Sequence, residues 1–106
     1  MRTLEFDVKQ QYISIRNGCD TSGLVAGSVN YLRAKFYFSN DEWNECRKAA
    51  SFWVGNREHS ALLDENNSCV IPKEALIGKS FRVSVSGASS DFSIKTNRVK
   101  IRQEAY

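Results

Sequence analysis

The sequence predicts an all-β protein, built as an antiparallel two-sheet β-sandwich with one or two short helical turns. Three observations lead to this fold class. Apolar and polar residues alternate in short runs, turn-forming residues separate those runs, and only two stretches carry signals for the start of a helix. Strict alternation means that a strand has one buried and one solvated face, which is typical of antiparallel sheets.

The alternating runs extend from the first residues to the last. Their apolar positions are Leu4, Phe6 and Val8; Ile13 and Ile15; Leu32, Ala34, Phe36 and Phe38; Ala50, Phe52 and Val54; Phe81, Val83 and Val85; and Val99 and Ile101. Turn sequences lie between them at Asn17-Gly18, Ser22-Gly23, Gly55-Asn56, 65–68 and 87–90. Roughly seven or eight short strands at this spacing, without a linker or repeat, favour one immunoglobulin-like sandwich domain over residues 1–106.

The first helical turn is expected at residues 39–45. Ser39 can cap it, and Glu42 stands three residues later, where it would complete a capping box. Phe38 and Trp43 occupy the two positions of a hydrophobic staple. Trp43 is therefore interpreted as a structural residue at the corner between two strands.

The stretch LLDENNSCVIPKEAL, residues 62–76, is expected to form a second corner. Pro72 fixes φ near the helical value at a position where its missing N–H costs little, so it begins a helical turn. Proline also pushes the preceding Ile71 to extended geometry, which ends a strand and places Cys69 on the same face. Residues 64–68 then form the hairpin loop. Cys69 and Pro72 are interpreted as structural.

Length and composition indicate a globular domain. The chain has 106 residues, of which 42% are hydrophobic and 25% charged, and this balance argues against disorder. No apolar run approaches the roughly 18–20 residues of a membrane span. The first residues alternate in polarity and carry acids, unlike a signal peptide, so synthesis in the cytoplasm is expected. The net charge of +3 does not by itself call for a nucleic-acid partner.

The residue pattern gives little support to catalysis or metal binding. Cys19, Cys46 and Cys69 lack C-x-x-C spacing and are expected to be reduced, mostly packing thiols. A cysteine enzyme would pair Cys69 with His59, the only histidine, but no third residue is marked to orient the ring. The gaps between these four residues are too irregular for a zinc site. We expect a non-enzymatic protein with no metal and no cofactor.

The outward-facing aromatic residues are the best functional candidates. Tyr31, Tyr37 and Trp53 fall on the polar side of their strands, together with Arg33. Aromatic and Arg residues are enriched where partner subunits dock, so these four residues are interpreted as a docking surface. A carbohydrate-binding surface is one alternative, and it requires Trp53 or Trp43 to lie exposed in a groove with polar neighbours. A nucleic-acid surface that includes Arg33 and Lys35 is another.

A basic stripe formed by Lys95, Arg98, Lys100 and Arg102 lies near the C-terminus. It is interpreted as the solvated face of an edge strand, where charge discourages edge-to-edge aggregation. Contact with nucleic acid is an alternative, but the expectation is that the protein has no nucleic-acid partner.

Four motifs in order carry a resemblance to a known family. They are YLRAKFYFSNDEWNECRKAASFWVGN, LLDENNSCVIPKEAL, FRVSVSG and IKTNRVKI, and they cover most of residues 29–101. Together they resemble a small domain that opens baseplate upper proteins and related tail-fibre components of tailed phages and prophages of Gram-positive bacteria. The matching positions are Trp43, Lys48, Ala50, Phe52, Leu63, Asp64, Cys69, Pro72, Glu74, Leu76, Val83, Ser84, Val85, Gly87, Thr96, Asn97 and Val99.

This resemblance implies a structural role. The expected protein is a β-sandwich adaptor of the virion tail that docks onto other tail or baseplate proteins and forms a homo-oligomer. The matching elements are core, caps and corners, so no catalytic residue carries over. Family members often continue into a coiled or fibrous region, which leaves open a free-standing tail protein or a domain excised from a longer one. Because receptor recognition is also a task of tails, a cell-surface glycan remains an alternative ligand.

Overall fold

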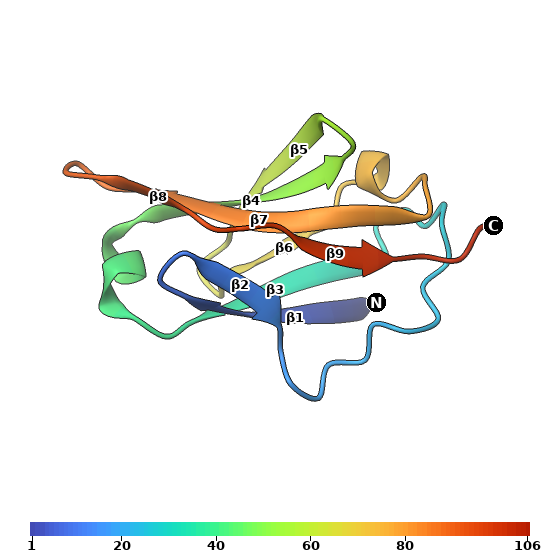
Figure 1. The fold of residues 1–106 in the computed structure, drawn as a ribbon, viewed down its shortest axis with the longest axis horizontal. Helices are drawn as coiled ribbons and strands as arrows, with labels where there is room; N and C mark the ends of the chain where they lie inside the picture. The colour runs from blue at the N-terminus through green and yellow to red at the C-terminus, as the bar shows by residue number, and fades with distance from the viewer.

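The computed structural model describes residues 1–106 and shows two β-sheets packed face to face (Figure 1). The first sheet has the order β2 (Tyr12–Ile15), β1 (Arg2–Lys9), β3 (Leu32–Phe38), β6 (Ser68–Val70). The second has the order β5 (Arg57–Leu62), β4 (Arg47–Val54), β7 (Ser80–Ala88), and both β8 (Ser93–Lys95) and β9 (Val99–Arg102) pair with β7. Two 3-10 turns, η1 (Asp41–Glu45) and η2 (Lys73–Ala75), complete the fold. No helix has the length and apolar character that crossing a membrane requires.

The core is the layer of apolar side chains between the two sheets. It is a cluster of 19 buried residues, most of which come from the alternating apolar positions of the strands. Phe6 stacks on Phe36 with ring centroids 5.3 Å apart, and Phe52 packs against Phe81 at 6.4 Å. Burying one such side chain contributes roughly 1.5–3 kcal/mol. The predicted two-sheet sandwich is confirmed.

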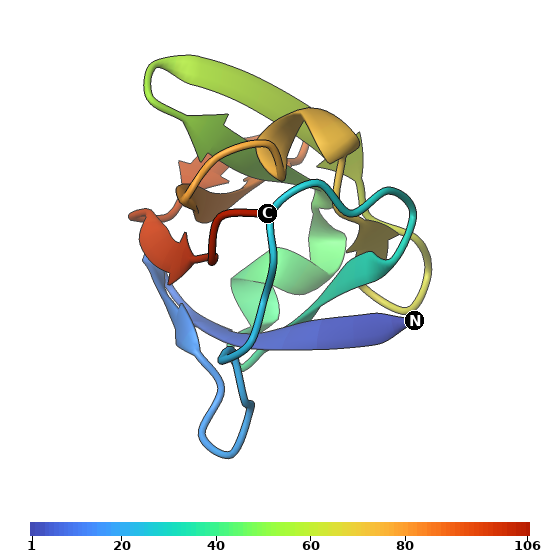
Figure 2. The same ribbon diagram turned by 90° about the vertical axis from the view of Figure 1, so that its right-hand side faces the viewer.

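One strand pair departs from the expected antiparallel arrangement. β1 and β3 are parallel, with Arg2 opposite Leu32 and Val8 opposite Phe38, because the chain returns after β2 to the end at which β1 begins before it enters β3. The segment 16–31 therefore passes across the end of β1 to reach its far edge (Figure 2). Leu24 and Ala26 of this segment are buried, so the crossing also closes one end of the sandwich.

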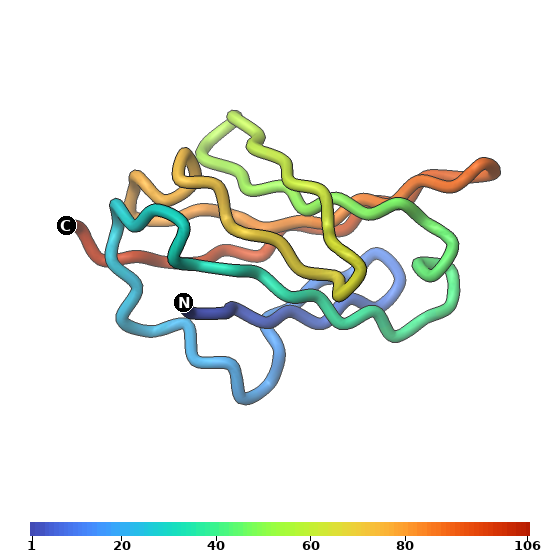
Figure 3. The backbone as a smooth tube through the Cα atoms, turned by 180° about the vertical axis from the view of Figure 1, so that it is seen from behind, coloured from blue at the N-terminus to red at the C-terminus, as the bar shows by residue number.

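The two halves of β7 pair with different strands. Its last residues pair with β8 and its first residues with β9, and the register shifts by one residue between them. Thr96 lies in the resulting bulge, where its hydroxyl accepts a hydrogen bond from the main-chain N–H of Val85 at 3.0 Å. β8 was not predicted, because three residues are too few to show alternation. The β7–β8 hairpin extends beyond the rest of both sheets (Figure 3).

The η1 turn forms where expected, but it is capped differently. Asn40, not Ser39, is the N-cap residue, and no side chain caps the turn. The Asn40 amide oxygen instead accepts the N–H of Gln10 at 2.8 Å, and the Ser39 hydroxyl donates to the Val8 carbonyl at 3.2 Å. The predicted capping box is wrong, since both side chains are engaged by the end of β1.

Trp43 anchors the η1 turn in the core, as predicted for a corner residue. The indole is fully buried, its N–H donates to the carbonyl of Gln10 at 3.0 Å, and its ring lies 4.9 Å from that of Phe38. Gly87 of β7 also lies close to the indole, where a Cβ atom would stand 2.9 Å from the ring. The close approach of β7 to Trp43 therefore requires glycine.

The second predicted corner also forms. Cys69 is buried and Pro72 directly precedes η2. The loop before β6 is organised by Asp64, whose Oδ1 accepts the N–H groups of Asn66 at 2.9 Å and Ser68 at 3.0 Å. These hydrogen bonds stabilise the carboxylate and therefore lower the pKa of Asp64. The bond from the Ser68 N–H has the largest effect.

Candidate functional site

The four residues predicted to form a docking surface do not share one face. Arg33 and Tyr37 lie on the outer side of β3 in the first sheet, whereas Trp53 lies on the outer side of β4 in the second. The outer faces of a sandwich point in opposite directions, so one flat partner cannot cover both. Tyr31 precedes β3 and belongs to the loop at the closed end. Alternation identifies an outward side chain but not the sheet from which it points.

On the first sheet, Tyr37 and Arg33 are occupied by neighbours from the same chain. The Tyr37 hydroxyl donates to the Glu5 carboxylate, and the Arg16 guanidinium carbon lies 3.7 Å from the centre of the Tyr37 ring. The bond to Glu5 is the main cause of a raised pKa of Tyr37, since it favours the protonated hydroxyl. Arg33 pairs with Asp64 at 3.3 Å. Few polar groups of Tyr37 and Arg33 are therefore free to bind a partner protein.

A group of exposed apolar side chains gathers at the closed end of the sandwich. They line adjoining hollows that contain Gly27, Ser28 or both. We call this group the terminal patch, and its members are Val25, Val29, Tyr31, Ile77 and Tyr106. Figure 2 looks onto this end and shows the loop before β3, the η2 turn and the C-terminus close together. Because three separate segments supply the patch, no periodic pattern in the sequence reveals it.

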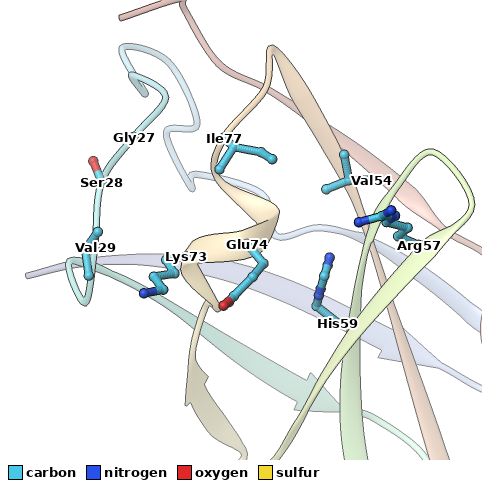
Figure 4. Close-up of a pocket in the computed structure, with 9 residues that line it drawn as sticks. All are labelled: Gly27, Ser28, Val29, Val54, Arg57, His59, Lys73, Glu74 and Ile77. Carbon is cyan, nitrogen blue, oxygen red and sulfur yellow. The ribbon is translucent and has the colours of Figure 1, made fainter.

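The only histidine lines one of these hollows, which has a volume of about 320 Å³ (Figure 4). His59 comes from β5, while Glu74 and Lys73 come from η2 on the opposite wall. The His59 side chain makes no hydrogen bond, and the hydroxyl of Ser28 donates to the carbonyl of Val25 at 3.4 Å. A catalytic nucleophile needs a base within hydrogen-bonding reach. The hollow contains no such pair.

Cys69 is a packing thiol of the core. Its side chain is 6% exposed, and burial raises its pKa to about 12 because the thiolate is disfavoured away from water. Cys69 does not line the hollow that contains His59. Cys46 is also buried, whereas Cys19 is partly exposed. No three His, Cys, Asp or Glu side chains lie where they could hold a metal ion together.

Trp53 lines a polar groove of about 210 Å³ on the outer face of the second sheet. Its indole N–H donates to the hydroxyl of Ser84 at 2.9 Å, and the Arg98 guanidinium carbon lies 3.5 Å from the ring centre. The other lining residues are Ser51, Glu58, Val85, Ser86, Lys95 and Thr96. Because Arg98 covers the ring, Trp53 forms a wall of the groove and not an open platform. Trp43 cannot serve as a platform either, since it is buried.

The groove was only partly foreseeable from the sequence. The sequence predicts Trp53 as part of a docking surface and the basic stripe as the solvated face of an edge strand, as two separate features. The bulge at Thr96 brings them together, because it carries Lys95 and Arg98 alongside β7 next to Trp53. The serines of β4 and β7 gave no signal, since alternating serine is common on solvated strand faces.

Comparison with known proteins adds no family to this description. No protein-family model matches the chain, and no curated protein matches it either.

Proposed function

We propose that this chain is a non-enzymatic assembly module of a phage or prophage tail that associates with a second copy of itself through the terminal patch. The observation that carries the proposal is the gathering of Val25, Val29, Tyr31, Ile77 and Tyr106 at one end of the sandwich. Contiguous exposed apolar surface on a small protein typically marks a site of interaction. Burying it against a partner would supply the hydrophobic term that drives association.

The shape of the patch suits a protein partner. Val29 is 57% exposed and Ile77 is 72% exposed, and both border the same hollow, Val29 from the loop before β3 and Ile77 from the loop after η2 (Figure 4). A projecting side chain of one copy can enter a hollow of the other, which is how anchor residues work at interfaces. The patch is thus built of both projections and hollows.

The charges around the patch favour a second copy as the occupant. Its rim carries the cations Arg57 and Lys73 and the acids Glu74 and Glu104, all of them exposed. In a twofold contact the same surface meets itself, so a rim of one sign would repel. A rim of both signs allows each acid to approach a cation of the other copy.

The tail context rests on the sequence resemblance. The proposed role is baseplate- or tail-fibre-associated, with synthesis in the cytoplasm of the bacterial host and incorporation into the virion. Other tail proteins would bind the assembled oligomer. A sandwich without an assembled nucleophile–base pair and with an apolar end is compatible with that role.

Sedimentation equilibrium over a wide range of protein concentration tests the proposal. The wild-type mass is expected to rise above that of one chain, and Ile77→Ser is expected to weaken self-association roughly tenfold, as for loss of an interface anchor. Leu62→Ser is the matched control, because Leu62 is 71% exposed on the edge strand β5, outside the patch. It should leave self-association unchanged.

Two results would overturn the proposal. One is a wild-type protein that stays monomeric at every concentration. The other is an equal effect of Ile77→Ser and Leu62→Ser, which would mean that association depends on general stickiness and not on the terminal patch. The melting temperature of each variant shows whether a change of mass reflects unfolding.

A further inference from the structure

The outer face of the second sheet carries a large excess of positive charge. We call the residues concerned the basic face, and they are Arg82, Lys95, Arg98, Lys100 and Arg102. All five side chains are exposed. The two salt bridges of the chain are Arg16–Asp7 and Arg33–Asp64, so no residue of the basic face is paired.

On the opposite outer face of the sandwich, some cations form ion pairs with acids. There two cations pair with acids of the same chain: Arg16, which directly follows β2, contacts Asp7 at 2.8 Å, and Arg33 of β3 contacts Asp64 at 3.3 Å. The net charge of the chain is only +3, so the basic face reflects the placement of charges more than their number. The basic face therefore lacks the acid partners that Arg16 and Arg33 have on the other face.

The register of the strands increases the repulsion on the basic face. Arg82 of β7 and Lys100 of β9 are directly opposite each other in the antiparallel ladder. Like charges at directly opposite positions destabilise a sheet. Such an arrangement is relieved when an anion binds between the two side chains.

The groove beside Trp53 supplies neutral hydrogen-bonding groups next to this charge. Ser51 and Ser84, at 4% and 8% exposure, are buried on its floor. Ser84 accepts one hydrogen bond from Trp53, and Ser86 makes none with its side chain, so both hydroxyls are free to donate. Glu58 accepts from Ser51 and has further lone pairs at the groove wall. Hydroxyls, a carboxylate and two cations therefore surround one small space.

We infer that the basic face binds an anionic glycan. The acidic group of one sugar unit would lie between Lys95 and Arg98, and its hydroxyls would bond to Ser84, Ser86 and Glu58. At about 210 Å³ the groove is smaller than the roughly 300–1,000 Å³ of pockets for drug-sized ligands, so it suits one unit of a longer chain. Further acidic units would follow Arg82, Lys100 and Arg102 along the sheet.

The same geometry disfavours single-stranded nucleic acid. Sequence-independent binding of single strands combines positive charge with aromatic rings on which the bases stack. Trp53 is the only aromatic residue in the groove, and its ring is covered by Arg98 at 3.5 Å. The basic face therefore offers charge and hydroxyl contacts but no open stacking surface.

Titration of the intact protein with defined polymers, monitored by calorimetry and by tryptophan fluorescence, tests the inference. Oligogalacturonate carries carboxylates and dextran sulfate carries sulfate esters on sugar chains, while unmodified dextran is the neutral arm. Oligothymidylate and poly-glutamate present negative charge without sugar hydroxyls in the same arrangement. We expect binding of at least one anionic glycan, weakening with added salt, and tighter than that of oligothymidylate and poly-glutamate.

Variants locate the site. Arg98→Gln and Lys100→Gln are each expected to weaken the glycan roughly tenfold, the effect of losing one charged contact. Lys35→Gln is the matched control, since it removes the same charge from β3 on the opposite face. It should change the affinity less than twofold, by the weak coupling of exposed charges across a solvated protein. Lys100 does not line the groove, so its variant still tests the inference if Arg98→Gln disturbs the groove.

Several outcomes would overturn the inference. The first is that neither anionic glycan binds, or that neutral dextran binds equally well. The second is that oligothymidylate or poly-glutamate binds as tightly as the glycans. The third is that Lys35→Gln lowers the affinity for the glycan as much as Arg98→Gln does. The basic face shares no residue with the terminal patch. A failure of the glycan-binding inference would therefore leave the proposed self-association untouched. A failure of the proposed self-association would likewise leave the glycan-binding inference untouched.

Discussion

The side-chain amide of Asn97 holds the backbone of Ile13 as a neighbouring strand would. The Asn97 Oδ1 accepts the N–H of Ile13 at 2.8 Å, and its Nδ2 donates to the Ile13 carbonyl at 3.4 Å. The main-chain N–H of Asn97 also donates to the carbonyl of Gln11 at 3.1 Å. Since Ile13 belongs to β2 of the first sheet and Asn97 to the bulge of the second, this contact closes one side of the sandwich and covers an edge that would otherwise be open.

Asn97→Ala is expected to lower the free energy of unfolding by about 1–3 kcal/mol. The change removes the partner of a partly buried N–H and weakens the closure of the sandwich. Urea denaturation followed by tryptophan fluorescence, to which Trp43 and Trp53 both contribute, measures the effect. Asn44→Ala in η1 serves as the control, because Asn44 is exposed and makes no side-chain hydrogen bond. Equal stability of the two variants would show that the Asn97 contact contributes nothing.

Gly87→Ala is expected to destabilise the protein by about 1–3 kcal/mol through overpacking. The added Cβ would stand 2.9 Å from both the Trp43 ring and the Cβ of Cys46, and neither can move without disturbing the core. Gly78→Ala is the matched control, because its Cβ would meet nothing within 4 Å and its φ is not positive. That change should be neutral or slightly stabilising. Thermal melts of both variants decide the point, and an undamaged Gly87→Ala protein would contradict this account of the corner.

The three thiols should react with a disulfide reagent in a fixed order. Cys19 is partly exposed and is expected to react in the native protein, whereas Cys46 and Cys69 are buried and should react only after unfolding. The reagent needs the thiolate, which burial of Cys69 suppresses by raising its pKa to about 12. The measurement is the number of protein thiols that react with the reagent near pH 8, first in the native and then in the denatured protein. Rapid native labelling of Cys69, located by mass spectrometry, would reopen the possibility of a reactive cysteine.

The same thiol makes stability fall in alkali. Above its ordinary pKa of 9.0 the Cys69 thiol loses its proton in the unfolded chain, while in the folded protein it keeps it up to about pH 12. The unfolded state then binds fewer protons, so the free energy of unfolding decreases with pH, by at most about 1.4 kcal/mol per pH unit. Cys69→Val should show a shallower decline above pH 9. Identical slopes in denaturation curves would show that Cys69 does not cause the decline.

Asp64 makes stability fall in acid. Its folded-state pKa lies below the ordinary 3.8, mainly because Ser68 and Asn66 donate main-chain N–H groups to the carboxylate. The stabilisation is present above that ordinary value and is lost as the pH falls through the folded-state pKa. Asp64→Asn keeps the shape of the loop but removes the titrating group. It should therefore be less stable than the wild type at neutral pH and show a smaller loss below pH 4 in acid denaturation. A wild-type acid profile in the Asn variant would assign the loss to other carboxylates.

Much of the fold follows from the sequence because alternation is a local signal. Strands such as 32–38 and 81–85 alternate so regularly that their buried faces can be named residue by residue. Pro72 acts through its own ring and its immediate neighbour, so its corner is visible from a short stretch. Cys69 was correctly placed in the core for the same reason.

Other features depend on contacts between distant segments, and only the tertiary structure decided them. The parallel pairing of β1 with β3 depends on the path of residues 16–31, and no local pattern states that path. The predicted capping box of η1 is wrong because the Ser39 hydroxyl bonds to Val8 of β1 and the Asn40 amide oxygen bonds to Gln10 just after β1, so neither side chain caps a main-chain N–H of the turn. When a side chain can bond either to a local or to a distant partner, the packing of the whole protein decides between them. The sequence of the turn alone does not indicate that packing.

The candidate sites show the same division. From the sequence alone, Tyr37 and Trp53 are outward-facing aromatic residues, and both predictions were correct. Assembly of the two sheets decided three further features. Tyr37 and Trp53 stand on opposite sheets, five apolar residues from three segments meet at one end, and Arg98 lies over Trp53. A strand determines the side to which each residue points. Which partners it finds there depends on the other strands, because sheet order and register are properties of the whole chain.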